Sequence, residues 1–294
     1  MSRPEILLLG RNGQVGWELE RALAPLGRVT ALGRGEADLT SPDRLREVVR
    51  SRRPSVIVNA AAYTAVDQAE GEPEAAFAAN ATAPGILAEE AKRLGALLVH
   101  YSTDYVFDGG AARPYREDDA PGPLNVYGRS KLEGERAIQA ATDDHLILRT
   151  SWVYGTRGRN FLLTILRLLA ERDELRIVAD QVGAPTWSRM IAAATAAVLA
   201  RHTGASRPVG VFHLTAAGQT TWHGFATAIR DRAGGSAAGK PVRPIASSEY
   251  PVPAARPRWS VLDGARLEAA FGVELPSWDA SLALALAETG GLRS

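Results

Sequence analysis

The chain has 294 residues, of which 46% are hydrophobic and 23% charged, so a disordered or collagen-like protein is excluded. It contains no cysteine, which excludes disulfides, thiolate metal sites, iron–sulfur clusters and a cysteine nucleophile. Its 34 basic and 33 acidic residues nearly cancel, so charge gives no reason to expect binding to nucleic acid or to an anionic membrane surface. We recognise no targeting or membrane-spanning segment, and we expect a cytoplasmic protein.

Short apolar runs alternate with helix-like segments over the first half of the chain. The expected strands cover residues 5–10, 28–32, 55–60, 96–102 and 145–150, and the expected helices cover 17–26, a segment starting at 41, 73–94 with a break near Pro84, and 127–142. The strands are continuously apolar, which is typical of a parallel sheet covered by helices on both faces. The sequence therefore predicts an α/β fold with a Rossmann-like doubly wound parallel sheet, whose ligand lies at the carboxyl ends of the strands.

Beyond residue 150 this alternation weakens. Helices are expected at 161–171, 188–201 and 222–232, and a strand at 209–214. Residues 233–258 are rich in Gly, Pro, Ala and Ser, which predicts irregular structure or a flexible loop over a site. We expect a dinucleotide-binding domain in residues 1–150 and a smaller substrate-binding lobe in 151–294, with the segments near 188–214 returning to the first domain.

A glycine-rich turn joins the first expected strand to the first expected helix. Gly10, Gly13 and Gly16 have the spacing G-x-x-G-x-x-G, one residue longer than the usual dinucleotide fingerprint. Glycines there allow a tight turn and a close backbone approach to a pyrophosphate, and the amino terminus of the helix attracts the anion. The position of the motif favours a dinucleotide over a turn without a ligand.

Tyr127 and Lys131 form a Tyr-x-x-x-Lys motif at the start of an expected helix. At this spacing both side chains lie on one face of the helix. A nearby ammonium favours the ionised form of a tyrosine. Ser102 and Thr103 end the fourth expected strand, where a hydroxyl would lie beside the cofactor. A hydroxyl that orients a carbonyl, a proton donor and a cation are the groups needed to reduce a ketone with a nicotinamide.

The sequence resembles the dTDP-4-dehydrorhamnose reductase family of the extended short-chain dehydrogenase/reductase superfamily. The segments that carry the resemblance run in order over nearly the whole chain, and they include GRNGQVGWEL, VNAAAYTAVDQAE, HYSTDYVFDG, PLNVYGRSKLEGE, RTSWVYG, DQVGAPT, TTWHGFA and PVPAARPRWSVL. The resemblance implies reduction of the C4 keto group of dTDP-4-dehydro-L-rhamnose with NADPH or NADH. This reaction is the last step of dTDP-L-rhamnose synthesis, which feeds O-antigen and other polysaccharides.

The resemblance also implies roles for individual residues. Tyr127 would be the proton donor, Lys131 would hold the nicotinamide ribose and tune Tyr127, and Thr103 would contact the substrate at the reacting centre. The substrate would also contact Asp104 and Trp152, and Arg256 would anchor its diphosphate, for which an Arg fork is suited. Together with the glycine loop, the residues expected to contact the cofactor are Gly10, Arg11, Asn12, Gly13, Gln14, Val15, Gly16, Arg34, Asp38, Leu39, Ala60, Ala62, Tyr63, Thr64, Asn80, Tyr127 and Lys131.

The end of the second expected strand bears on the choice of nucleotide. NAD enzymes usually carry an acidic residue there, whereas an Arg accommodates the 2′-phosphate of NADP. Here Gly33 stands at the position where the acidic residue is usual, Arg34 follows it, and Arg11 lies in the glycine loop. We therefore expect a preference for NADPH with some use of NADH, although Asp38 could reach the ribose.

Two other functions stay open at this point. One is a nucleotide-sugar 4-epimerase of the same superfamily, against which Gly33 argues. The other is a non-catalytic protein, because a relative of this family is a regulatory subunit of methionine adenosyltransferase. The presence of Thr103, Tyr127 and Lys131 favours catalysis.

Some members of the family form a dimer around Mg²⁺ held by glutamates. Glu18 and Glu288 match two of these positions, but the third is Arg189. Because Mg²⁺ requires hard oxygen ligands, we expect Arg189 to pair directly with Glu18 or Glu288 in place of the metal. The resulting prediction is a monomer or homodimer with no metal site.

Overall fold

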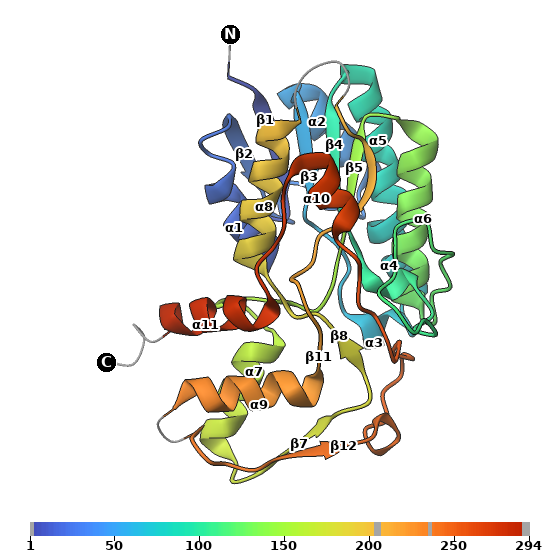
Figure 1. Cartoon of the computed structure of the whole chain (residues 1–294). Coiled ribbons are helices and arrows are strands. Elements are labelled where there is room, and N and C mark those ends of the chain that lie inside the picture. The colour runs from blue at the N-terminus through green and yellow to red at the C-terminus, as the bar shows by residue number, and fades with distance from the viewer. Residues whose placement is uncertain (1–2, 203–206, 235–236, 290–294) are drawn as a thin grey trace.

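The computed structural model describes residues 3–202, 207–234 and 237–289. Its centre is a sheet of six parallel strands in the order β10-β5-β4-β3-β1-β2 (Figure 1). The strands are β1 (Glu5–Leu9), β2 (Arg28–Leu32), β3 (Val56–Asn59), β4 (Leu97–Thr103), β5 (His145–Thr150) and β10 (Gly210–His213). This topology confirms the predicted doubly wound Rossmann-like sheet.

Helices cover both faces of this sheet. They are α1 (Gln14–Ala22), α2 (Pro42–Arg52), α3 (Val66–Ala69), α4 (Pro73–Phe77), α5 (Ala83–Leu94), α6 (Val126–Ala141), α8 (Ser188–Arg201) and α10 (Ala265–Phe271), with a π-helical turn η1 (Ala78–Thr82) and a 3₁₀ turn η2 (Asp104–Val106). Side chains alternate between the faces along each strand. Ile6 and Leu8 therefore pack with α1, α8 and α10, whereas Leu7 and Leu9 pack with α2, α5 and α6.

The remaining elements form a second lobe beside the carboxyl edge of the sheet (Figure 1). They are β6 (Val153–Tyr154), β7 (Leu175–Val178), β8 (Val182–Gly183), β9 (Thr186–Trp187), β11 (Thr220–Thr221), β12 (Val242–Ile245), α7 (Phe161–Glu171), α9 (Trp222–Ala233), α11 (Trp278–Thr289) and the 3₁₀ turn η4 (Ser247–Glu249). Tyr154, Phe225 and Leu282 belong to the separate apolar core of this lobe. Helix α8 and strand β10 lie with the large sheet, because α8 packs on α1 and β10 pairs with β5.

Several boundaries differ from those expected. Helix α1 begins at Gln14, a turn before the expected start, because the glycine loop leads directly into it. The break in the long 73–94 segment is the π-helical turn at Ala78–Thr82, and Pro84 lies just after it in the first turn of α5, where proline needs no amide hydrogen. The expectation of irregular structure throughout 233–258 was wrong, because β12 pairs with β7 inside that segment.

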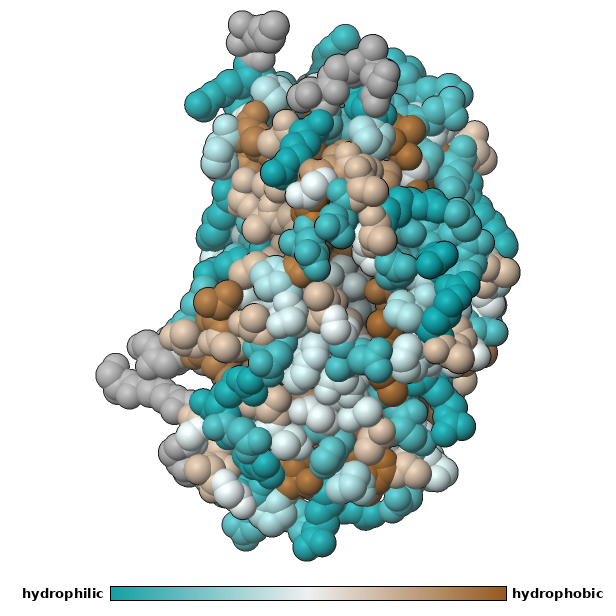
Figure 2. All heavy atoms as spheres, viewed as in Figure 1, coloured by the Kyte–Doolittle hydropathy of each residue, from teal (hydrophilic) through white to brown (hydrophobic). Residues whose placement is uncertain are grey.

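The face of the molecule shown in Figure 2 mixes hydrophilic and apolar residues, and the apolar ones lie in separate patches. Among the described residues, the large hydrophobic side chains that are exposed are Leu124, Val209, Tyr250, Val252 and Leu284. No helix in the described ranges is long and apolar enough to cross a membrane.

Candidate active site

The glycine loop lies between β1 and α1 and has no room for larger residues at two positions. Gly10 has φ +89°, and a Cβ on Gly16 would lie 2.0 Å from the carbonyl oxygen of Gly10. No side chain caps α1 at Gly13, so the first amide groups of the helix are free to meet an anion. Arg11 and Asn12 lie at the surface of the loop, and these features fit the pyrophosphate of a dinucleotide. Gln14 accepts a hydrogen bond from Asn160, and Val15 packs against the core beneath the loop.

The turn after β2 carries two carboxylates and one guanidinium. Arg34 Nε lies 3.2 Å from Asp38 Oδ2, and Asp38 Oδ1 accepts hydrogen bonds from Thr40. These Thr40 hydrogen bonds, with Arg34, lower the pKa of Asp38. The backbone amide of Gly33 donates to the carboxylate of Glu36 at 3.0 Å, which places an acidic side chain at the end of β2 that the sequence interpretation missed. Leu39 is buried in the core under this turn.

The segment after β3 is held by one buried asparagine. Asn80, in the π-helical turn η1, accepts a hydrogen bond from the Tyr63 amide at 2.8 Å and donates to the Tyr63 carbonyl at 3.0 Å. Its amide also donates to Ser130 of α6 at 3.0 Å. Asn80 therefore fixes the backbone of the predicted cofactor segment, while Ala60, Ala62 and Thr64 remain partly or fully exposed on it.

Thr103 and Tyr127 are close to each other at the carboxyl end of β4. Thr103 is buried, and its hydroxyl accepts from the Tyr105 amide and donates to Asp104. Burial raises the pKa of Tyr127 to about 12, against the opposing effect of a hydrogen bond with the Thr103 side chain. The Tyr127 ring also meets the ring of Tyr105 edge-on at 5.7 Å. Tyr127 thus keeps its hydroxyl proton at neutral pH, as a proton donor must.

Lys131 lies one turn after Tyr127 on α6 and is almost completely buried. Its Nζ donates to the Tyr101 carbonyl at 2.6 Å and lies 3.1 Å from Nε2 of His100. Burial lowers the pKa of Lys131 to about 8, although Glu135 opposes this.

Two aromatic side chains form a stack at the entrance to the second lobe. The rings of Trp152 and Trp222 are parallel within 3°, with centroids 3.5 Å apart. Trp152 has φ +44°, a left-handed conformation that non-glycine residues seldom adopt. A Cβ at Gly183 would lie 2.4 Å from the Trp152 ring, so the stack depends on that glycine. Trp222 was missed as a site residue, although the segment TTWHGFA contains it.

Asp104 is a buried carboxyl group next to Thr103. Burial raises its pKa to about 7, and hydrogen bonds from Ser260 and Thr103 oppose this. Its Oδ2 has no hydrogen-bond partner among the residues that the structure describes. Such an atom is available to a hydroxyl group of a ligand, because a buried polar atom without a partner is costly.

Arg256 reaches across from the second lobe to the first. Its guanidinium donates to Asp67 Oδ2 at 2.8 Å and to the carbonyl of Ala254 at 3.2 Å, and it lies 5.9 Å from the centre of the Tyr105 ring. The Ala254 amide donates to the same Asp67 carboxylate. The structure therefore brings Arg256 to the Tyr105–Tyr127 ring pair, on the side of the sheet where Thr103 ends β4.

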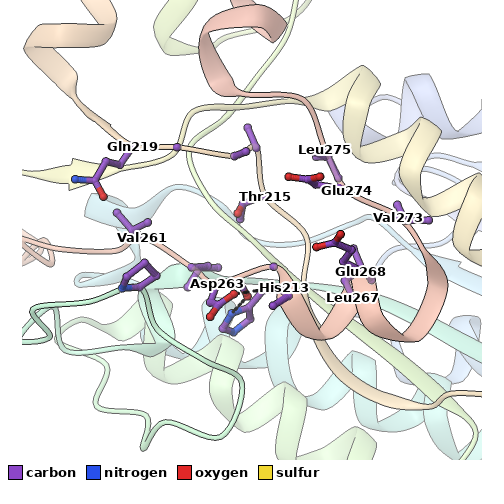
Figure 3. A pocket seen from close by; sticks show the side chains of 17 residues that line it. His213, Thr215, Gln219, Val261, Asp263, Leu267, Glu268, Val273, Glu274 and Leu275 are labelled. Carbon is purple, nitrogen blue, oxygen red and sulfur yellow. Dashed lines mark hydrogen bonds between the residues drawn. The ribbon is translucent and has the colours of Figure 1, made fainter.

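A separate cavity of about 400 Å³ lies where α10 meets the loops after β10 (Figure 3). His213, Thr215, Asp263 and Glu268 are among the residues around it. The cavity contains none of the predicted cofactor or substrate residues, so it is distinct from the site at the ends of β1, β3 and β4.

Comparisons with known proteins agree over almost the whole chain. A family model described as the RmlD substrate binding domain matches residues 4–290. The chain is 54% identical to a dTDP-4-dehydrorhamnose reductase of Burkholderia thailandensis over 284 residues, which covers 93% of this chain and 95% of the relative. The chain belongs to the dTDP-4-dehydrorhamnose reductase family. An Escherichia coli K12 member is 46% identical over 93% of this chain and 94% of its own length.

Solved structures extend this result to the fold. A dTDP-4-dehydrorhamnose reductase of Bacillus anthracis, in complex with NADP, superposes with a TM-score of 0.92 at 34% identity and covers 98% of this chain and 100% of its own. A UDP-glucose 4-epimerase of Thermus thermophilus, in complex with NAD, has a TM-score of 0.81 but only 20% identity over 98% of this chain and 99% of its own. The epimerase shares the fold alone, so its activity says nothing about this member of the reductase family.

Proposed function

We propose that this protein reduces the C4 keto group of dTDP-4-dehydro-L-rhamnose to dTDP-L-rhamnose, with NADPH, or alternatively NADH, as the hydride donor. The reaction is the last step of dTDP-L-rhamnose biosynthesis. The observation that carries this proposal is the contact of Thr103 with Tyr127 at the end of β4, with Lys131 one turn along α6, in a chain 54% identical to a reductase of that name. The first 150 residues would hold the nucleotide cofactor, and most of residues 151–294 would form the substrate lobe.

The residues of the glycine loop fit a dinucleotide, and several others would complete its site. Gly10, Gly13 and Gly16 bring the backbone close to the pyrophosphate, and the amino terminus of α1 meets its charge. Arg34 and Asp38 after β2 would hold the adenosine end, and Asn80 positions the backbone of Tyr63, which would border the cofactor. When bound, NADPH supplies the hydride that the ketone needs.

The chain's own residues supply the proton and the orientation. Tyr127 holds a proton on its hydroxyl, since its pKa lies near 12, and gives it to the sugar oxygen as negative charge develops there. Thr103 would orient the same oxygen once its hydroxyl turns from Asp104 to donate to the substrate instead. The Nζ of Lys131 would bind the nicotinamide ribose.

The remaining side chains would bind the substrate. The unpartnered Oδ2 of Asp104 accepts a hydrogen bond from a sugar hydroxyl. The Trp152 ring, supported by its stack on Trp222, covers an apolar face of the 6-deoxy sugar. Arg256 offers its guanidinium to the diphosphate, in competition with Asp67. That the protein works in the cytoplasm as a monomer or homodimer, without nucleic acid or membrane partners, stays a prediction.

One experiment separates the candidate functions. The purified protein is mixed with dTDP-4-dehydro-L-rhamnose and NADPH, and cofactor oxidation is followed by absorbance while the product is identified by NMR. We expect one NADPH to be consumed for each dTDP-L-rhamnose formed. An epimerase would convert nucleotide sugars without net consumption of cofactor, and a regulatory protein would show no turnover. Either of these results would contradict the proposal.

A further inference from the structure

A histidine and an asparagine lie directly behind Lys131. His100 is in the middle of β4 and is 1% exposed, and it pairs in the sheet with Asn59 of β3. The Nδ1 of His100 is 3.1 Å from Nδ2 of Asn59, and its Nε2 is 3.1 Å from Nζ of Lys131. The three side chains therefore form a continuous buried row from the centre of the sheet to α6.

The orientation of Asn59 follows from its second contact. Its Oδ1 accepts a hydrogen bond from the backbone amide of Ala61 at 3.2 Å, so its Nδ2 faces His100. An amide nitrogen can only donate, and therefore Nδ1 of His100 must accept. Burial lowers the pKa of His100 well below its usual value, and a charge on Lys131 would lower it further, so the ring is neutral in either state of the lysine. A neutral ring that accepts at Nδ1 carries its proton on Nε2, where it points at Lys131.

This arrangement affects the proton on Lys131. An ammonium can only donate, so it would face the Nε2–H donor of His100 without a hydrogen bond. A neutral amine can accept from Nε2–H and still donate to the Tyr101 carbonyl. Every polar atom in the row is thus satisfied when Lys131 is an amine, whereas one donor–donor contact remains when it is an ammonium.

We propose that Asn59 and His100 are a positioning pair for Lys131. Asn59 fixes His100 as the Nε2–H tautomer, and this tautomer favours the neutral amine form of Lys131 over the ammonium. Neither residue of the pair needs to touch substrate or cofactor. The pair acts through Lys131, whose Nζ is proposed to bind the nicotinamide ribose. The proposal rests on the proposed function only for its consequence in kinetics, because the tautomer and the lysine proton can be observed directly.

Other charged groups near Lys131 act separately from the pair. Tyr127 lies one turn before it on α6, and Glu135 one turn after it. Glu135 raises the pKa of Lys131, but its carboxylate is itself bound to Arg149 of β5 at 2.6 Å. Asp104, in the turn after β4, acts on Tyr127 instead. The facing residue Asn80, from η1, is uncharged and bonds to Ser130. A change at Asn59 therefore tests the pair while these groups stay in place.

The decisive variant is Asn59→Asp. A carboxylate has nearly the shape of the amide but can only accept, so it should pull the proton of His100 to Nδ1. Nε2 then accepts from the ammonium of Lys131. Together with the added negative charge, this should raise the pKa of Lys131 by about one pH unit or more. The matched control is Thr195→Val, which removes a buried hydrogen bond to Tyr101 on the opposite face of β4.

Two isotope labels report the outcome by NMR without an activity assay. Histidine labelled with ¹⁵N reports which ring nitrogen carries the proton. Lysine labelled with ¹³C at Cε reports the titration of Lys131, because the chain has only two other lysines, Lys92 and Lys240, which can be assigned by substitution with Arg. In the wild-type full chain we expect the Nε2–H tautomer of His100 from pH 6 to pH 8. A stable Nδ1–H tautomer or an imidazolium would overturn the proposal without any variant.

The variants complete the test. In Asn59→Asp we expect the Nδ1–H tautomer and a Lys131 titration raised by about one pH unit, with the alkaline limb of kcat/KM moved in the same direction. Thr195→Val should change neither. The proposal would be overturned if the His100 tautomer switches while the pKa of Lys131 stays the same. It would also be overturned if the pKa of Lys131 rises with an unchanged tautomer, because the added charge alone would then explain the rise. If the wild-type protein shows no reductase activity, the proposed function is wrong, but both NMR results still test the proposed pair.

Discussion

The guanidinium of Arg189 lies 3.2 Å from Oε2 of Glu18, which joins the amino-terminal end of α8 to the middle of α1. The other side of the same guanidinium pairs with Glu288 of α11. Glu18 is buried, whereas Arg189 is partly exposed over the Trp187 ring. The expected direct pairing of Arg189 with these glutamates is thus confirmed, and three helices meet at one cation supplied by the chain itself.

Because Arg189 pairs with these glutamates, we expect the reductase activity to be independent of Mg²⁺. The guanidinium of Arg189 already pairs with both carboxylates and occupies the space between them, so a metal ion would have to displace it. Turnover should therefore be the same in EDTA and in excess Mg²⁺, and elemental analysis should find no stoichiometric metal. Arg189→Glu would place three carboxylates together, so its thermal stability should rise on addition of Mg²⁺ while that of the wild type does not. Loss of wild-type activity on chelation, restored by Mg²⁺, would contradict this.

Removal of the Tyr127 hydroxyl should stop proton donation. We expect Tyr127→Phe to lower kcat by roughly 10²–10⁴, the usual contribution of general acid catalysis. Its affinity for NADPH, measured by fluorescence titration, should change little because the ring stays in place. Tyr154→Phe is a suitable control, since the Tyr154 hydroxyl is buried without a hydrogen-bond partner in the second lobe. Near-normal turnover in Tyr127→Phe would exclude this tyrosine as the proton donor.

Lys131→Ala should reduce both cofactor affinity and kcat, because it removes the group that binds the nicotinamide ribose and a charge beside Tyr127. The two effects are measured by titration with NADPH and by steady-state kinetics. Lys92→Ala provides the comparison, since Lys92 lies in the last turn of α5 at the protein surface. A variant at Lys131 that keeps its NADPH affinity would show that the lysine does not hold the ribose.

The turn after β2 predicts the nucleotide preference. Arg34 is 83% exposed in its side chain and is free to leave Asp38 for a 2′-phosphate. Arg34→Ala should therefore lower kcat/KM for NADPH about tenfold or more while that for NADH changes little. Because Glu36 accepts from the Gly33 amide at the end of β2, Glu36→Gln should move the preference further toward NADPH. Equal use of both nucleotides by wild type and Arg34→Ala alike would count against this reading.

The raised pKa of Asp104 should make the stability of the folded protein depend on pH. Its pKa is about 7 in the fold, against an ordinary value of 3.8, so the folded protein binds this proton more tightly than the unfolded chain does. The stabilisation is complete below about pH 4 and is lost as the pH rises through 7. Across that range the wild type should lose unfolding free energy, on the order of 3 kcal/mol, relative to Asp104→Asn. Urea unfolding at several pH values measures the difference, and parallel curves for the two proteins would refute it.

Local features of the chain were enough to predict much of the fold. The apolar runs and helical spacing over residues 5–150 are set by near neighbours, and strands of this kind leave few arrangements other than a parallel sheet. The glycine loop and the Tyr127–Lys131 spacing are also local, so both could be placed before the structure was known. The strand β12 was missed because Arg243 and Pro244 interrupt its apolar pattern, and its formation depends on pairing with β7.

The sequence by itself therefore determined the alternation of strands and helices, the phosphate loop and the residues at the end of β4. Only the tertiary structure decided which distant residues meet: Arg256 with Asp67, 189 positions apart, Trp152 with Trp222, and His100 with Lys131. The physical reason is that backbone preference and amphipathic spacing act over a few residues, whereas these pairs are selected by the packing of whole elements. The tertiary structure also decided the protonation states of Asp104, Tyr127 and Lys131, because the pKa of each is shifted by burial under distant segments of the chain.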